Sequence, residues 1–137
     1  MKNTYSTNLS LPKIDLGLLI FRIGISALML THGIPKLINF FGSEEIAFAD
    51  PIGLGEATTF TLAVFAEFLC SVLILIGLGT RLAVIPLILT MAVIILVVHI
   101  SDGFGSHELP LLYLLGYIFL FFSGSGKYSL DWYFLKK

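Results

Sequence analysis

Charged residues are scarce in this sequence. They make up 12% of its 137 residues, while hydrophobic residues make up 57%. A water-soluble domain has roughly a quarter of its residues charged, so this chain has too little polar surface to cover itself in water. The 8 lysine and arginine residues form no basic patch and belong to no nucleic-acid-binding motif, which excludes nucleic acid as a partner. The length is that of a single domain, residues 1–137.

Cysteine and histidine are also rare, with one Cys and three His in the chain. Cys70 alone makes no internal disulfide and runs no dithiol chemistry, so a self-contained thiol relay is excluded. No HExxH motif or Cys/His set is present, and no metal site is expected. A bis-histidine haem needs two histidines at one depth, whereas the helical rise separates His32 and His99 by roughly 9 Å.

Long apolar segments take the place of charge, and the mean hydropathy is +0.98. A bilayer core about 30 Å thick is crossed by about 20 apolar residues in a helix. Four segments are long enough, at roughly 15–40, 57–78, 82–101 and 107–124. The first is too long for a signal peptide and is expected to remain as a span. The sequence therefore predicts an all-α fold, an antiparallel up-down bundle of four transmembrane helices.

Turn residues mark the borders of these spans. Gly77 and Gly79 are expected to end the second helix, and Pro110 to lie in the first turn of the fourth, where its missing N–H costs nothing. Basic residues lie before the first span (Lys13), between the second and third (Arg81) and after the fourth (Lys127). The other two loops hold only acidic charges. Because basic loops stay in the cytoplasm, we expect a plasma-membrane protein with both termini inside. The tail, residues 127–137, predicts an interfacial segment.

Ionisable residues within membrane spans are rare and usually face a bundle interior or a wet cavity. Five lie in the predicted spans: Arg22, His32, Lys36, Glu67 and His99. The helical period places the first three within an arc of about 80° on one face. The helical rise puts His32 and Glu67 within about 3 Å of the same depth, so we expect Glu67 to contact His32 and Lys36. Arg22, about 15 Å from His32 along the axis, is not expected to touch Glu67.

Two interpretations of these residues remain open. In one, Glu67, His32 and Lys36 form a polar pocket that opens to the outer side, with His99 near its rim. The break at Gly33-x-Pro35 then forms the pocket wall by freeing backbone carbonyls. In the other, the charged residues only hold the first two helices together, and the long basic side chains reach an interface.

The pattern Arg22-x-Gly24 followed by His32-Gly33-x-x-Lys36 resembles the DoxX family of small bacterial membrane proteins. Glu67, the segment "LILIGLGTRLA" and the closing "GSGKYSLD" share the resemblance, which covers about residues 14–131. The family is named for its similarity to a membrane subunit of a thiosulfate:quinone oxidoreductase. The resemblance therefore implies a four-span protein of the bacterial inner membrane that is linked to quinone chemistry.

The leading hypothesis is a membrane subunit that passes electrons from an outer-side donor to quinone. Glu67 and His32 would be catalytic, with Glu67 as the protonatable group. Lys36, Arg22 and His99 would bind quinone or an anion through charge-assisted hydrogen bonds. Quinone is the candidate cofactor, and the electrons would come either from quinone itself or from a redox partner protein. Two other classes stay open: a proton-coupled exporter built as a homo-oligomer of four-span chains, and a non-enzymatic assembly partner.

Overall fold

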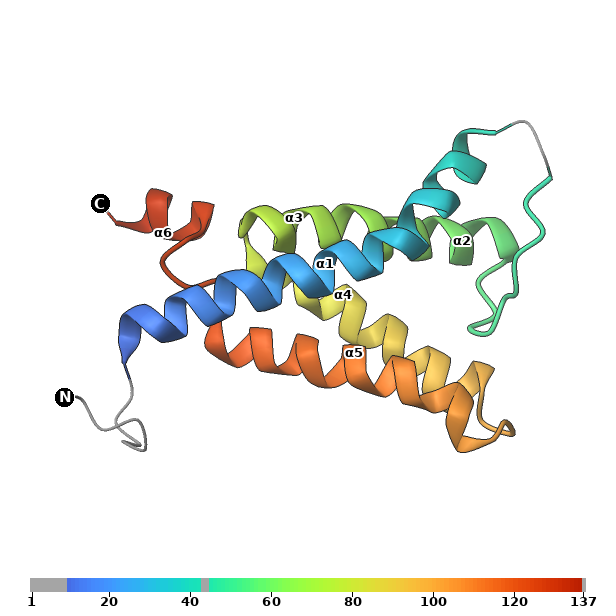
Figure 1. The fold of residues 1–137 in the computed structure, drawn as a ribbon. Coiled ribbons are helices and arrows are strands. Elements are labelled where there is room, and N and C mark those ends of the chain that lie inside the picture. Colours follow the sequence, from blue (N-terminus) through green and yellow to red (C-terminus); the bar gives the residue numbers. More distant parts are fainter. Residues whose placement is uncertain (1–9, 43–44, 137) are drawn as a thin grey trace.

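The computed structural model describes residues 10–42 and 45–136, and that part of the chain is all-helical. Four helices are long and apolar enough to cross a membrane: Leu11–Phe41, Glu56–Ile76, Thr80–Val98 and Phe104–Ser123. Consecutive spans run in opposite directions (Figure 1). The predicted fold class, an all-α bundle of four antiparallel spans, is confirmed.

Two of the four spans change their helical hydrogen-bonding pattern part-way. The elements in chain order are α1 (Leu11–Phe41), α2 (Glu56–Val64), η1 (Phe65–Cys70), α3 (Ser71–Ile76), α4 (Thr80–Val93), η2 (Ile94–Val98), α5 (Phe104–Ser123) and α6 (Leu130–Leu135). The segments η1 and η2 are π-helical. Such turns insert a residue into an α-helix and are frequent at functional sites. Glu67 lies within η1.

The helix borders agree with the sequence prediction at one turn and differ from it at another. Gly77 and Gly79 adopt φ values of 72° and 59° in the tight turn between α3 and α4, a conformation that favours glycine. Pro110 lies inside α5 and not in its first turn, so that prediction was wrong. The helix begins earlier than expected because the backbone already turns at Gly103, whose carbonyl accepts a hydrogen bond from the N–H of Ser106 at 3.0 Å.

The bundle core is built from apolar side chains of all four spans. Cys70 is 2% exposed within it, as a small buried hydrophobe. The outward faces are apolar too, and the exposed side chains there include Leu82, Leu89, Leu112 and Leu115. An apolar surface of this extent is stable in lipid and not in water. The protein is therefore a membrane protein with four spans.

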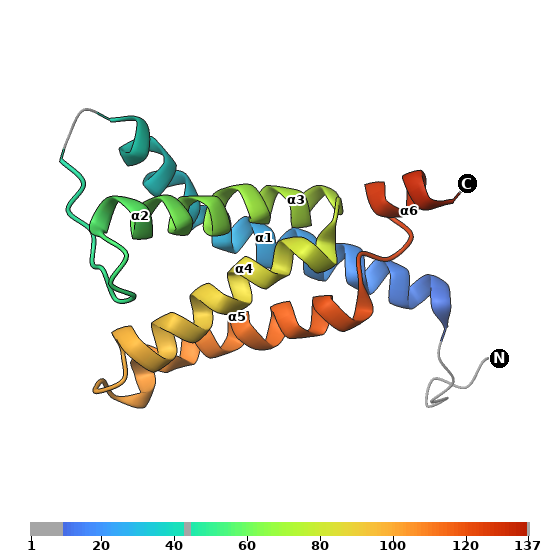
Figure 2. The same cartoon turned by 180° about the vertical axis from the view of Figure 1, so that it is seen from behind.

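The two ends of the bundle differ in charge. The beginning of α1, the α3–α4 turn and α6 lie at one end, and the loops before α2 and α5 lie at the other (Figures 1 and 2). The first end carries four cations, Lys13, Arg81, Lys127 and Lys136, beside two carboxylates, Asp15 and Asp131, and the second carries the carboxylates Glu45, Asp50, Glu56 and Asp102. Lys137, expected in the interfacial tail, lies outside the described residues.

Candidate functional site

Helix α1 changes direction in its last turns, in the cyan part of the ribbon in Figure 1. Pro35 lies inside this helix. Because proline has no N–H, the carbonyl of Thr31 loses its helical partner, and a proline in this position commonly kinks a helix. The bend turns the end of α1 relative to the second span, which packs against it.

Gly33 lies against the backbone of the second span. A Cβ atom at this position would stand 2.5 Å from the carbonyl oxygen of Glu67 and 2.9 Å from the backbone nitrogen of Phe68. No side chain fits in that space, so Gly33 lets α1 and η1 touch through their backbones. The Gly33-x-Pro35 pattern therefore has two effects: Pro35 frees the Thr31 carbonyl, as the sequence predicted, and Gly33 makes a close contact between two helices, which the sequence did not predict.

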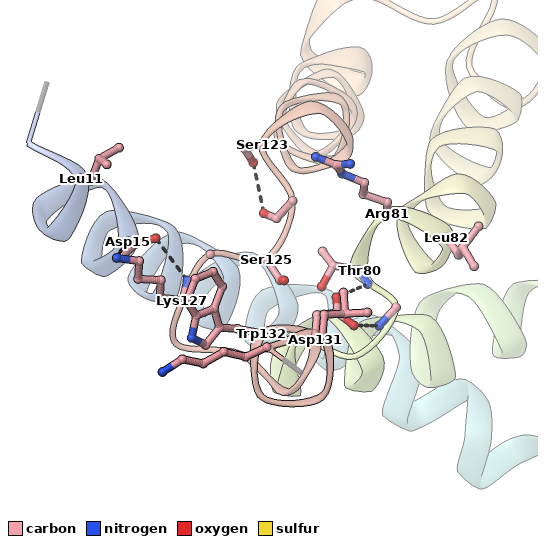
Figure 3. A pocket seen from close by; sticks show the side chains of 15 residues that line it. Leu11, Asp15, Thr80, Arg81, Leu82, Ser123, Ser125, Lys127, Asp131 and Trp132 are labelled. Carbon is pink, nitrogen blue, oxygen red and sulfur yellow. Dashed lines mark hydrogen bonds and ion pairs between the residues drawn. The ribbon is translucent and has the colours of Figure 1, made fainter.

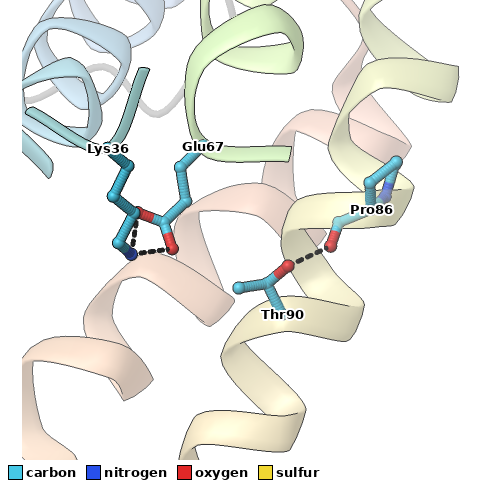
Figure 4. A network of polar contacts seen from close by, with 4 residues as sticks. All are labelled: Lys36, Glu67, Pro86 and Thr90. Atoms are coloured by element: carbon cyan, nitrogen blue, oxygen red, sulfur yellow. Dashed lines mark hydrogen bonds and ion pairs between the residues drawn. The ribbon is translucent and has the colours of Figure 1, made fainter. Parts of the chain in front are cut away.

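Lys36 and Glu67 form an ion pair beside this contact (Figure 4). The Nζ atom of Lys36 donates to both carboxylate oxygens of Glu67 at 2.6 Å. The Glu67 side chain is 4% exposed and that of Lys36 is 28% exposed, so the acid is buried and the base reaches the surface. The ring of Phe48 lies 5.7 Å from the ammonium group and adds a cation–π contact. The predicted contact between Lys36 and Glu67 is present.

A cavity of about 120 Å³ adjoins the pair and is bounded by residues from all four spans. Its lining consists of Met29, His32, Lys36, Glu67, Met91, Ile94, Leu109, Pro110 and Tyr113. His32 shares the cavity with Glu67, but in the part of the chain that the structure describes no hydrogen bond joins them. The imidazole instead lies edge-on to the ring of Tyr113, with 6.4 Å between centroids. One acid, two bases and a phenol therefore surround one small space.

Buried hydroxyl groups also lie in the bundle core, and one of them belongs to a neighbour of the cavity residue Tyr113. Tyr113 and Tyr117 stack with 6.0 Å between their ring centroids, and Tyr117 is 0% exposed. The hydroxyls of Tyr117, Ser26 and Ser71 are buried without a hydrogen-bond partner among residues 10–42 and 45–136. Buried polar atoms of this kind are commonly satisfied by water. Sequence reasoning missed these groups, although two tyrosines four residues apart in an apolar span were a visible signal.

Two of the five candidates lie away from the cavity. The guanidinium of Arg22 donates to the carbonyl oxygens of Ser125 at 3.3 Å and Tyr128 at 2.7 Å. Arg22 is 1% exposed, because the segment after α5 folds over it and encloses its guanidinium in protein. His99 Nδ1 lies 2.6 Å from a carboxylate oxygen of Asp102. The structure thus brings together Glu67, Lys36 and His32 only.

The family model for DoxX matches residues 17–100. The chain belongs to the DoxX family. An uncharacterized membrane protein of Mycobacterium tuberculosis is 32% identical to it, in a match over 80% of this chain and 76% of the relative. An uncharacterized protein of Haemophilus influenzae is also 32% identical, over 85% of this chain and 89% of the relative. No solved structure matches the chain.

The DoxX match covers nearly all of the first three spans, including the Lys36–Glu67 pair. On this DoxX protein the pair joins the first two spans, since Lys36 lies in α1 and Glu67 in η1. The described residues include no group of three His, Cys, Asp or Glu side chains that could hold a metal ion. The site is an acid–base pair within a membrane bundle.

Proposed function

We propose that this DoxX protein is the membrane subunit of a quinone-linked oxidoreductase. The observation that carries the proposal is the buried Glu67 carboxylate, both oxygens of which lie 2.6 Å from Lys36 Nζ at the edge of a cavity. Ionisable groups inside a membrane are costly, and they usually mark a path or site for ions, protons or ligands. Quinone dissolves in the bilayer, so it reaches a site at this depth directly from the lipid.

The cavity fits the edge of a quinone ring. Its volume of about 120 Å³ is below the 300–1,000 Å³ that is typical for sites enclosing a whole ligand, so the ring would enter from the lipid side. Met29, Met91 and Leu109 supply apolar walls for the ring face. The ammonium of Lys36 and the imidazole of His32 supply donors for a ring oxygen. Bound there, the quinone would supply two-electron redox chemistry.

The Lys36–Glu67 pair would couple that chemistry to protons. When Lys36 turns a donor toward a ring oxygen, Glu67 loses part of its counter-charge and takes up a proton, because an unpaired charge is costly in this setting. His32 then exchanges protons between the pair and the surface. Reduction of one quinone needs two electrons and two protons. The electrons would come from a partner protein that holds its own redox centre.

The topology follows from charge. We infer that the protein lies in the bacterial inner membrane with the end carrying Arg81 and Lys127 in the cytoplasm, as lysine and arginine placement directs. The cavity beside Lys36 is nearer the opposite end and would take its protons from the outer side. Arg22 and His99 bind other parts of the chain and have no part in this site.

Replacement of Glu67 by Gln tests the proposal. The substitution keeps the shape of the side chain and removes its proton exchange, and loss of a general acid–base group lowers a rate by roughly a hundredfold or more. We expect that loss in quinone reduction by membranes that contain the variant and its partner at verified expression. Glu56→Gln is the matched control, since Glu56 is an exposed carboxylate in the same span. An unchanged rate in Glu67→Gln would contradict the proposal.

Direct binding separates a quinone site from an assembly function. A photoreactive quinone analogue should label the stretch of α1 around Met29 and His32, and Lys36→Met should reduce the labelling. A chain that takes up no label and purifies with an equal amount of one other protein would instead be an assembly partner. Proton-driven uptake of a solute by vesicles would indicate an exporter.

A further inference from the structure

A second and larger cavity lies at the opposite end of the bundle from the Lys36–Glu67 pair (Figure 3). Its volume is about 680 Å³, within the range of about 300–1,000 Å³ found for ligand sites. The first turn of α1, the beginning of α4, the loop after α5 and helix α6 enclose it. None of its lining residues belongs to the site described above.

Three cationic side chains line this cavity: Arg81, Lys127 and Lys136. A guanidinium N–H of Arg81 donates to the carbonyl oxygen of Phe122 at 3.2 Å, which leaves its other donors available. The ammonium of Lys127 lies 5.6 Å from the ring of Trp132. These cations come from separate parts of the chain and meet only in the folded bundle.

The two carboxylates in the lining are already occupied by backbone donors. Asp131 accepts hydrogen bonds from the backbone nitrogens of Gly79 at 2.7 Å and Thr80 at 3.2 Å (Figure 3). Asp15 accepts one from the backbone nitrogen of Lys127 at 3.1 Å. The nearest approach between a lining lysine and a carboxylate is the 3.9 Å between Lys127 Nζ and Asp15 Oδ2. The cavity therefore has an excess of positive charge that its own acids satisfy only weakly.

The rim of the cavity is apolar. Leu11, Leu82 and Leu135 line it and are 66%, 74% and 80% exposed. Trp132 lies beside the lysines, and tryptophan is typical of the level at which lipid headgroups lie. A cationic interior with an exposed apolar rim, at the end of four membrane spans, matches a molecule with an anionic head and a hydrocarbon tail.

We propose that this cavity binds a phosphate-bearing anion, and that the anionic phospholipids of the bilayer supply it. Lysine and arginine at the membrane surface each favour anionic lipid, and basic pockets between spans hold lipid headgroups. The phosphate group lies among Arg81, Lys127 and Lys136, and the acyl chains run along the leucines of the rim. The bound lipid then links α1 and α4 to the C-terminal segment.

Retention of lipid by the purified full-length protein tests this site. Native mass spectrometry would compare phosphatidylglycerol with phosphatidylcholine on the wild type and on Lys127→Gln/Lys136→Gln. Both lysines are exposed, so the double variant keeps its fold, which a helical circular dichroism spectrum verifies. We expect the wild type to prefer phosphatidylglycerol and the double variant to lose affinity for it roughly tenfold. Lys13→Gln is the control, because Lys13 is an exposed cation near the same end but outside the lining.

Three results would overturn the proposal. An equal loss in Lys13→Gln would show general attraction to the surface, and equal retention of the two lipids by the wild type would show no site for an anion. Inorganic phosphate, added in excess without lipid, is the separate arm. Inorganic phosphate could displace phosphatidylglycerol completely and raise the melting temperature of the protein as much as phosphatidylglycerol does. In that case the ligand is a soluble phosphate and the lipid assignment fails. Glu67→Gln should retain lipid normally, so this result is independent of the quinone proposal.

Discussion

Gly33 and Glu67 lie in backbone contact: Gly33 has no side chain, and the peptide group of Glu67 occupies the space that a side chain would fill. A Cβ atom on Gly33 would be 2.5 Å from the Glu67 carbonyl oxygen, closer than real Cβ atoms approach. The contact is between main chains, so neither helix has a flexible side chain that could move aside. It sets the separation of α1 and η1 at the level where Lys36 meets the Glu67 carboxylate.

Gly33→Ala should therefore push the first two spans apart. Overpacking of a tight interface typically costs about 1–3 kcal/mol, so we expect a lower melting temperature in detergent and weaker function of the Lys36–Glu67 pair. Gly24→Ala in the same helix is the control: a Cβ there meets nothing within 4 Å, and alanine favours the helix over glycine. Equal melting temperatures for the two variants would show that the backbone contact does not limit packing.

Removal of one member of the ion pair should cost more than removal of both charges. Lys36→Met leaves the buried carboxylate of Glu67 without a cation, and breaking a buried pair in this way costs about 3–5 kcal/mol. The double variant Lys36→Met/Glu67→Gln leaves no charge and should be more stable than Lys36→Met alone. Unfolding in denaturant with a double-mutant cycle measures the coupling.

The exposed pair of Lys127 and Asp15 provides the contrast for that cycle. Its nitrogen and oxygen are 3.9 Å apart and the Lys127 side chain is 50% exposed. Exposed pairs contribute about 0–1 kcal/mol, so Lys127→Met should change the free energy of unfolding little. If Lys36→Met changes the free energy of unfolding as little as Lys127→Met does, a proton or water stabilises the Glu67 carboxyl group in place of Lys36.

Hydropathy and depth were sufficient to predict the four spans and the meeting of Lys36 with Glu67. Both depend on quantities that a sequence contains: the length of apolar runs and the rise per residue. The π-helical turn around Glu67 was not predictable, because a shift from one backbone hydrogen-bond partner to the next leaves composition unchanged. In the folded bundle this backbone packs against Gly33.

The position of Arg22 was not predictable for a different reason. Its acceptors, the carbonyls of Ser125 and Tyr128, lie more than a hundred residues further along the chain. A carbonyl oxygen is present on every residue, so the sequence carries no mark of those chosen as acceptors. The segment "GSGKYSLD" was noted for the family resemblance, and its last five residues were assigned to an interfacial tail, whereas the structure shows the segment wrapped over a buried guanidinium.

Arg22→Ala should release that C-terminal segment. A hydrogen bond to a charged group contributes about 1.5–3 kcal/mol, so loss of both should raise the open population at least roughly tenfold. We expect trypsin to cleave after Lys127 faster in proteoliposomes of this variant than in the wild type. Arg22→Lys should restore only part of the protection, since an ammonium lacks the planar fork of donors.

The control for this experiment is Lys13→Ala, which removes an exposed cation at the same end of the bundle but outside the lining of the larger cavity. Cleavage after Lys127 should change little there, because the printed hydrogen bonds of the C-terminal segment do not involve the Lys13 side chain. The backbone nitrogen of Asp131 also donates to the Gly77 carbonyl at 2.8 Å. If cleavage is unchanged in Arg22→Ala and the bundle is still helical, that backbone bond holds the segment without Arg22.

Asp50 organises the loop that leads into α2, and its effect should depend on pH. The carboxylate accepts hydrogen bonds from Thr59 Oγ1 at 2.6 Å, the Gly55 nitrogen at 2.8 Å and the Leu54 nitrogen at 3.1 Å. These bonds, that of Thr59 foremost, hold the pKa of Asp50 below its ordinary value of 3.8. A carboxyl with a lowered pKa stabilises the folded loop above its ordinary pKa, and this stabilisation is lost as the pH falls through the folded-state pKa.

Asp50→Asn removes that dependence on pH. Amide exchange at Leu54 and Gly55, expressed as protection factors to correct for the pH dependence of exchange itself, should be slower in the wild type than in the variant at neutral pH. The two proteins should converge only in acid below the lowered folded-state pKa, where the wild-type carboxyl of the folded loop also becomes protonated. Glu56→Gln, at the first residue of α2, should keep the wild-type profile because none of these three bonds involves its side chain. A difference between wild type and Asp50→Asn that persists unchanged in acid would mean that side-chain shape, and not the carboxylate charge, orders this loop.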